Sequence, residues 1–227
     1  MAKKIALRDK VRMHLMQQLQ NGHLKLDKTI NLARLSRELG ISVTPIREAL
    51  TQLEHVGIIK AEINRGFVIA KLTLAEARHL YQTIAELEAL ALSKSEFNTD
   101  DYNLLRTQLT ALVNTHTINF RIKEHFEFHR LLTHKANPIL LDILNNLRTR
   151  MLFYEQHYIR KSAFYENVDN QNEAIIQAIE EDNLPTAELI LKMNWMQILD
   201  HLSIEMAKNN PVIDAEEVTA TPEHTIV

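Results

Sequence analysis

The positions of glycine divide this chain into two parts. All four glycines of the 227-residue sequence lie within its first 66 residues, and residues 67–227 contain none. Turns whose backbone has a positive φ ordinarily use glycine. The later part of the chain is therefore expected to consist of helices joined by short connections that need no glycine. This pattern predicts two domains, with a boundary near residues 71–73.

Charge changes at the same boundary. Residues 1–71 hold 13 Lys and Arg against 6 Asp and Glu, whereas residues 72–227 hold 13 against 23. A basic front and an acidic back suggest a module that binds nucleic acid, attached to a module that does not touch phosphates. The alternative interpretation is an accidental excess of basic residues on a solvated surface.

Composition excludes several classes of protein. No apolar run approaches the length of a bilayer span, so a membrane partner is not expected. The first 20 residues interleave charged and apolar positions, unlike the continuous apolar block of a secretory signal. The absence of cysteine excludes disulfides, thiolate metal sites and a cysteine nucleophile, and it fits a cytoplasmic protein.

Three helices are expected in the front part. The first helix covers about residues 7–19, and the second covers 32–39 and ends at Gly40. The third begins after residues 41–43, where Ser42 and Thr44 are good N-cap residues and Pro45 suits the first turn. Its apolar face contains Ile46, Ala49, Leu50, Leu53 and Val56.

The opposite face of this third helix carries Thr44, Arg47 and Thr51. Two helices joined by a tight glycine-containing turn, with such residues facing outward, are typical of a helix-turn-helix. The following segment, IIKAEINRGFVIAKL, predicts a strand, a tight turn and a second strand, with Arg65 at the tip and Gly66 where backbone must come close to something. A helix in the major groove and a wing over the neighbouring groove would use both features.

Residues 5–71 resemble the winged helix-turn-helix of GntR-family bacterial transcription regulators. The resemblance rests on VTPIREAL, the LxxxGII close and the INRGFVI wing in register. It implies that two or three arginines carry most contacts to double-stranded DNA. Two expected arginines are absent, because Val43 and Ala33 occupy their positions, with Arg34 beside Ala33. The DNA contacts implied by position are Ser42, Thr44, Arg47, Arg65, Gly66 and Arg34. A mere cap at Thr44 or an ion pair at Arg47 is the structural alternative.

Six helices are expected after residue 73. They cover residues 74–94, 100–114, 117–134, 138–160, 163–181 and 185–207. Amphipathic helices of this length need partners, so the sequence predicts an antiparallel helical bundle. The fold class is thus mainly α, with domains at 1–72 and 73–207. Residues 208–227 have little periodicity and predict a flexible tail.

Residues 74–205 resemble the all-helical effector-binding domain, named FCD, of the FadR-type subfamily. LYQTIAELEALAL, HFEFHRLLTHKANPIL and EAIIQAIEEDNLPTAELIL carry this resemblance in order. It implies a ligand cavity inside the bundle, often with a divalent metal held by one aspartate and three histidines, and a small carboxylate effector nearby.

The ligand positions depart from that pattern. By position, His125 replaces the aspartate, His129 keeps the first histidine, and Asn172 and Asn194 replace the other two. His125 and His129 are spaced i, i+4 and point inward together. A divalent metal held by His125 and His129 stays open as an alternative, although amide oxygens are poor ligands for zinc, nickel or cobalt. Two buried histidines hydrogen-bonded to the asparagines or to a bound molecule are favoured.

A second departure concerns charge. The arginine that grips an effector carboxylate in the family is replaced by Ile84, which favours a less anionic ligand or none. Arg148, Arg150 and Arg160 are possible anion partners, although a solvated face is the favoured interpretation. Met193, Trp195 and Met196 could line a pocket, although packing in the core is the favoured interpretation.

These features predict a sequence-specific DNA-binding transcription regulator that forms a homodimer, binds an inverted repeat and responds to a small-molecule effector. One alternative is a regulator whose helical domain only dimerises. Another is a helical metal-dependent enzyme using His125 and His129, although the sequence has no P-loop, Rossmann or nucleophile-elbow motif. The sequence leaves open the effector, the operator and the choice between repression and activation.

Overall fold

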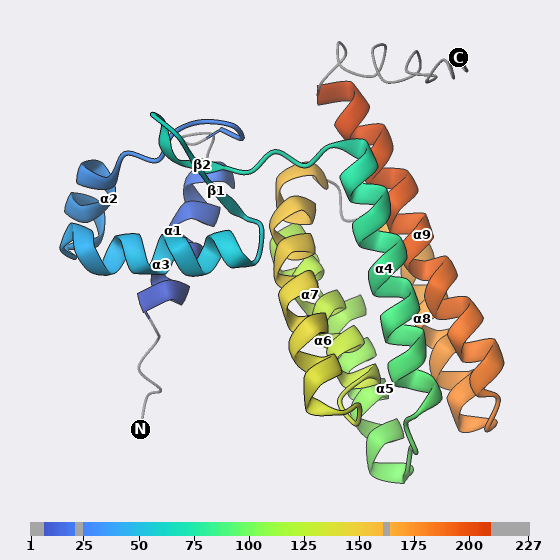
Figure 1. Cartoon of the computed structure of the whole chain (residues 1–227). Coiled ribbons are helices and arrows are strands. Elements are labelled where there is room, and N and C mark those ends of the chain that lie inside the picture. Colours follow the sequence, from blue (N-terminus) through green and yellow to red (C-terminus); the bar gives the residue numbers. More distant parts are fainter. Residues whose placement is uncertain (1–6, 21–24, 161–163, 210–227) are drawn as a thin grey trace, which may run out of the picture.

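The computed structural model describes residues 7–20, 25–160 and 164–209. The chain forms a small winged-helix head and a long helical bundle that lie side by side, as Figure 1 shows. Mainly helical architecture with one small hairpin confirms the predicted fold class. None of the described helices is long and apolar enough to cross a bilayer.

The head consists of three helices and a two-stranded sheet. They are α1 (Leu7–Gln20), α2 (Leu32–Leu39), α3 (Val43–His55), β1 (Ile59–Glu62) and β2 (Gly66–Ile69). The α2 helix begins at Asn31, whose side chain accepts a hydrogen bond from the Arg34 amide, and ends at Gly40 with φ of 65°. Residues 21–24, which follow the first helix, lie outside the described residues.

Apolar side chains from all three helices form the core of the head. Val11 and Leu15 of α1 and Ile46, Leu50 and Leu53 of α3 are each no more than 1% exposed. Helices α1 and α3 therefore pack against each other, while α2 crosses the end of α3. The buried face of α3 is the one that the apolar spacing predicts, and only Val56 is partly exposed.

The wing is an antiparallel pair in which Ile59 faces Ile69 and Glu62 faces Gly66. Its turn contains Asn64, with φ of 63°, and is followed by Gly66, with φ of 74°. The Ala61 amide donates to Glu54 Oε1 of α3 (2.8 Å), which ties the wing to the third helix. The predicted strand, turn and strand are confirmed.

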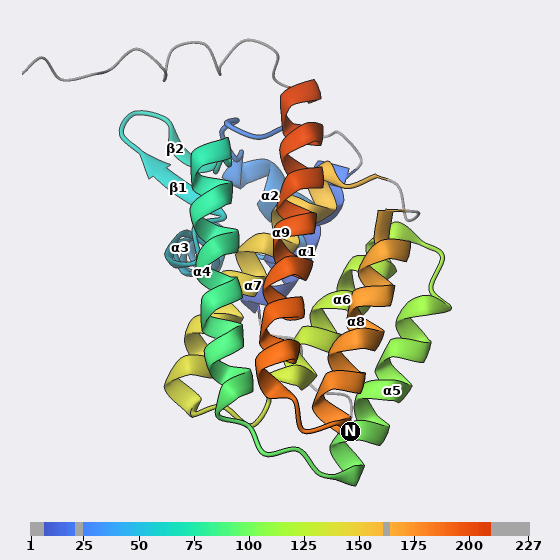
Figure 2. The same ribbon diagram turned by 90° about the vertical axis from the view of Figure 1, so that its right-hand side faces the viewer.

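Six helices form the bundle: α4 (Leu74–Ser93), α5 (Thr99–Val113), α6 (Ile118–Leu132), α7 (Pro138–Tyr158), α8 (Tyr165–Glu180) and α9 (Leu184–Asn209). Helix α9 packs between α4 and α8, while α7 lies between α4 and α6, and α5 closes the other side against α6 and α8. Figure 2 shows α4 and α9 side by side along their length. The predicted six-helix bundle is confirmed.

Several predicted helix boundaries in the bundle differ by one or two residues. Helix α9 includes Lys208 and Asn209, which the sequence assigned to the tail. Residues 210–227 lie outside the described residues. Side-chain caps explain several helix starts, since Asn98 and Asp101 form a capping box at α5, and Asn137 caps α7 ahead of Pro138.

Head and bundle touch through α7. Helix α1 packs against α7, and Arg150 of α7 lies beside Gly57, which lies two residues beyond the end of α3. A Cβ at Gly57 would lie 2.8 Å from the Arg150 guanidinium, and φ there is 73°. Arg150 also forms an ion pair with Glu76 of α4. Arg150 is therefore half-buried at the junction, which corrects its predicted place on a solvated face.

Candidate nucleic-acid interface and buried polar centre

The outer face of α3 is free of the bundle and of the rest of the head. Thr44, Arg47 and Thr51 are exposed, whereas the apolar residues between them are buried. Arg47 forms no ion pair with any residue that the structure describes. Its guanidinium is thus available to phosphates or to base edges, which bidentate arginines read in the major groove.

Ser42 and Arg34 lie near the start of the same surface. Ser42 is the N-cap residue of α3, with an extended backbone and no side-chain cap bond, so its hydroxyl is available to a partner. Arg34 is exposed on α2 and donates from Nε to Glu38 Oε1 (2.6 Å). Thr44 sits inside the first turn of α3 and is not the cap. Val43, at the position of an expected arginine, is 36% exposed.

Arg65 lies in the wing turn and is held by its neighbours. It pairs with Glu62, and its Nη2 donates to the carbonyl of Asp27 (2.8 Å). The Arg65 side chain is 44% exposed, and ion pairs of this exposure are weak and easily exchanged for phosphate. Gly66 is exposed beside it, and a Cβ at this position would meet no heavy atom of the described residues within 4 Å.

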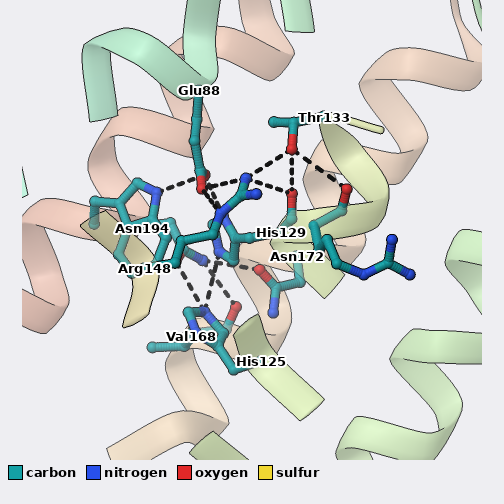
Figure 3. Close-up of polar contacts among 10 residues, drawn as sticks. Glu88, His125, His129, Thr133, Arg148, Val168, Asn172 and Asn194 are labelled. Carbon is teal, nitrogen blue, oxygen red and sulfur yellow. Dashed lines mark hydrogen bonds and ion pairs between the residues drawn. The ribbon is translucent and has the colours of Figure 1, made fainter. Parts of the chain in front are cut away.

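The four predicted residues of the bundle interior do come together. His125, His129, Asn172 and Asn194 are each 0% exposed. His125 Nε2 lies 3.3 Å from Asn194 Oδ1 and 3.2 Å from His129 Nε2. Asn194 Nδ2 donates to Asn172 Oδ1 (2.9 Å). Figure 3 shows this chain of contacts from α6 to α9 and α8.

A glutamate that was not predicted from the sequence completes this centre. Glu88 of α4 is fully buried, and its Oε2 lies 2.7 Å from His129 Nδ1 and accepts from Trp195 Nε1 (2.8 Å). Burial opposes its ionisation, but Arg148, together with His129 and Trp195, holds the pKa of Glu88 below its usual value. Glu88 is therefore a carboxylate, and His129 presents a protonated Nδ1 to it.

Arg148 is the counter-ion of this carboxylate, so its predicted place on a solvated face is wrong. Its side chain is 6% exposed, and Nε donates to Glu88 Oε1 (2.8 Å). Its Nη2 donates to the carbonyl of His129 (3.0 Å) and to Thr133 Oγ1 (2.7 Å), as Figure 3 shows. Arg160, in contrast, is exposed as expected.

The donor set of this centre does not fit a transition metal. Only two imidazoles are present, and the described residues contain no group of three His, Cys, Asp or Glu placed to share an ion. The amide oxygens of Asn172 and Asn194 already accept hydrogen bonds within the centre. Burial lowers the pKa of His125 well below its usual value, so its ring is neutral. Internal hydrogen bonds hold the ring positions instead.

A second buried carboxylate lies along α7. Glu155 is 0% exposed and accepts hydrogen bonds from Tyr81 (2.7 Å) and Tyr165 (3.0 Å). Burial raises the pKa of Glu155 to about 7, because no cation of the described residues compensates it as Arg148 compensates Glu88. The Tyr165 ring lies 5.5 Å from that of His125, so the two polar groups are neighbours.

Packing around the centre is aromatic. The Trp195 ring lies 4.2 Å from His129 and 5.5 Å from His125, centre to centre. Trp195 is fully buried, as predicted, whereas Met193 is 53% exposed and therefore not a core residue. Met196 packs partly buried against the core. Ile84, at the position of the family's arginine, is fully buried.

Comparison with known proteins gives two family matches. Residues 7–69 match the family described as bacterial regulatory proteins, gntR family, and residues 74–194 match the FCD domain. The first match covers the head, and the second covers the bundle from α4 into α9.

Individual relatives agree with these matches. The chain is 26% identical over 199 residues to YdhC of Bacillus subtilis (strain 168), described as an uncharacterized HTH-type transcriptional regulator, covering 84% of this chain and 89% of that protein. It is 25% identical over 177 residues to the HTH-type transcriptional regulator McbR of Escherichia coli (strain K12), covering 74% and 80%. The solved structure of E. coli McbR/YncC has the same fold, with a TM-score of 0.70, 22% identity and coverage of 89% and 100%.

Proposed function

Because this chain belongs to the GntR family of bacterial regulatory proteins and carries an FCD domain, it is a transcriptional regulator rather than an enzyme, and we propose that it binds an inverted-repeat operator as a homodimer. The proposal places Ser42, Thr44, Arg47 and Arg34 in or beside the major groove. It places Arg65 and Gly66 of the wing against the neighbouring backbone. The proposal implies that the protein is located in the bacterial cytoplasm, where it binds DNA.

The single observation that supports this proposal most is the two-sided character of α3. One face is anchored in the apolar core by Ile46, Leu50 and Leu53, and the opposite face presents the exposed Arg47. A helix fixed this rigidly can hold a guanidinium at one position relative to a base pair. The net positive charge of residues 1–71 supplies attraction for phosphates.

Dimerisation follows from the size of the head. A single head of this size neutralises few phosphates, so specific binding at physiological salt needs two heads on half-sites about one helical turn apart. We assign the pairing of heads to the bundle. A small-molecule effector then acts by preferring one of two arrangements of head and bundle. A bundle that only dimerises, without an effector, is the second candidate, favoured by the internally bonded polar centre.

Selection from a random duplex pool, followed by mobility shifts, tests the operator and the dimer together. We expect an inverted repeat to be recovered, and deletion of one half-site to weaken binding at least about 100-fold. Equal affinity for a lone half-site would contradict the dimer proposal. Thermal-shift screening separates the two candidates for the bundle, since a ligand that binds only the native state raises the melting temperature.

A further inference from the structure

A pocket of about 390 Å³ lies between the head and the bundle. Residues from three helices line it, together with Ile58 at the start of the wing. The lining residues are Arg12, Met13 and Gln17 of α1, Asn119, Phe120 and Lys123 of α6, and Thr149, Leu152, Phe153 and Gln156 of α7. This volume falls in the range of small-molecule sites in proteins. The pocket is distinct from the centre around His125 and His129, because it shares no residue with it.

The lining combines apolar walls with positive charge. Met13 and Phe120, which are 47% and 59% exposed, supply apolar surface beside the buried Phe153, while Lys123 of α6 and Arg12 of α1 are the two cations in the lining. No carboxylate is among the described residues that line the pocket. A site with cations, amides and apolar walls is complementary to an organic anion that carries an apolar body.

Gln156 adds an amide to the wall of the pocket. The residue is only 4% exposed, so its side chain is held within the fold rather than in open solvent. Because Gln156 lines the pocket, a molecule bound there would receive its amide hydrogen bonds.

Lys123 lies where two pockets adjoin. A second pocket of about 300 Å³ adjoins the first and shares Lys123, Thr149 and Leu152 with it. Lys123 also lies 5.4 Å from the ring centre of Phe120, so its ammonium group is placed beside an aromatic wall. An anion bound at Lys123 therefore has apolar surface close to it.

From these observations we propose that the junction pocket binds a small organic carboxylate with an aromatic body. The carboxylate pairs with Lys123 and accepts from the Gln156 amide, while the ring lies against Met13, Phe120 and Phe153. This site differs from a ligand cavity in the bundle interior.

Such a ligand would contact α1 of the head and α6 and α7 of the bundle at once. It would therefore favour the arrangement in which the two parts enclose the pocket. This consequence rests on the proposed DNA-binding function. Binding itself does not, because it is measured on the purified chain without DNA.

Titration calorimetry with 2-naphthoate tests the proposal, with 2-naphthylmethanol as the neutral counterpart of the same shape. We expect 2-naphthoate to bind about tenfold more tightly than the alcohol, since a charge-assisted hydrogen bond is lost in the alcohol. Lys123→Met should weaken naphthoate binding about tenfold and leave alcohol binding unchanged, while Lys123→Arg should restore it. Lys94→Met, an equal change of charge at the end of α4, should have no effect.

Methyl NMR gives the location of the bound molecule. Met13 and Met193 are 47% and 53% exposed, so they form a matched pair on α1 and on α9. We expect 2-naphthoate to shift the methyl resonance of Met13 and not that of Met193. Equal binding of the acid and the alcohol, unchanged binding by Lys123→Met, or an unshifted Met13 resonance would each overturn the proposal. Failure to bind DNA would affect none of these readouts.

Discussion

The head and the bundle differ in whether their polar side chains are buried. Among the described residues, every fully buried polar or charged side chain belongs to the bundle, from Glu88 to Asn194. The buried part of the head is apolar, and its arginines Arg34, Arg47 and Arg65 lie at the surface. The arginines of the head are therefore accessible to a large external partner, whereas the buried polar side chains of the bundle contact one another inside the fold.

This difference has an energetic consequence. A buried ion pair such as Glu88 with Arg148 adds little net stability, but removing one partner leaves an uncompensated charge and is costly. An exposed arginine on α3 costs little to remove, because no buried group depends on it as a partner. Substitutions in the bundle centre should act on folding, and substitutions on the head surface should act on binding.

The largest expected effect is at Glu88. Glu88→Gln keeps the shape of the side chain but leaves the buried charge of Arg148 without a counter-ion. We expect the free energy of unfolding to fall by about 3 kcal/mol, measured by urea denaturation.

Glu86→Gln is the matched control, two residues away on the same helix. Its side chain is 69% exposed and pairs with Lys192 at the surface. We expect a change within about 0.5 kcal/mol. If both substitutions cost the same, the contrast between buried and exposed charge would be wrong.

Arg47 is the corresponding test in the head. Arg47→Ala should weaken binding to the selected operator by about 1–3 kcal/mol and relax the base preference at one position, with a nearly unchanged urea midpoint. Arg130→Ala removes the same charge from α6 of the bundle, where the side chain pairs with Glu127. It should leave DNA affinity unchanged, as fluorescence anisotropy would measure. A stability loss at Arg47 without a binding loss would reverse the comparison.

The pH dependence of stability isolates Glu155. Its pKa is raised from 4.5 to about 7, so the native state holds the proton more tightly than the unfolded chain. The resulting stability is fully present below pH 4.5 and is lost as the pH rises through 7. The unfolding free energy of the wild type should decline by about 2 kcal/mol between roughly pH 5 and pH 8 relative to Glu155→Gln. Parallel profiles of the two proteins would contradict the raised pKa.

The smallest expected effect is at the wing. Arg65→Ala should weaken operator and unrelated duplex by similar factors and reduce the slope of log K against log salt by about 1. The fold should be unaffected, since Arg65 makes only exposed contacts with Asp27 and Glu62. A loss confined to the operator sequence would indicate base reading instead.

Most of the fold could be predicted from the sequence, because residues that begin or end helices are clearly placed in it. Gly40 ends α2, Asn137 and Pro138 begin α7, and apolar spacing identified the buried face of α3. Boundaries shifted by one or two residues, as at Lys208, where no cap residue fixes the helix end.

The candidate site was predicted only in part. His125, His129, Asn172 and Asn194 meet as the resemblance implied, but Glu88 was missed and Arg148 was misplaced. A signal existed, because Glu88 falls four residues after Ile84 and four before Leu92 on the buried stripe of α4. A charge on an apolar stripe requires a partner, yet spacing within one helix does not reveal which other helix supplies it.

The place of Arg150 and the junction pocket could not be predicted from the sequence, because both depend on contacts between separate elements. Helix periodicity indicates which face of α7 is buried, but not that the head would cover part of it. The contact of Arg150 with Gly57 and Glu76 joins residues that are distant along the chain. Such contacts depend on how two separately predictable domains pack.

The contrast between the two regions can be tested in one hydrogen-exchange measurement of the full chain, with and without the selected operator duplex. We expect protection at the start of α3 and in the wing turn, residues 42–51 and 62–67, with the amides around Glu88 and His129 unchanged. Protection confined to the bundle, with α3 and the wing exchanging as in the free protein, would contradict the assignment of DNA binding to the head.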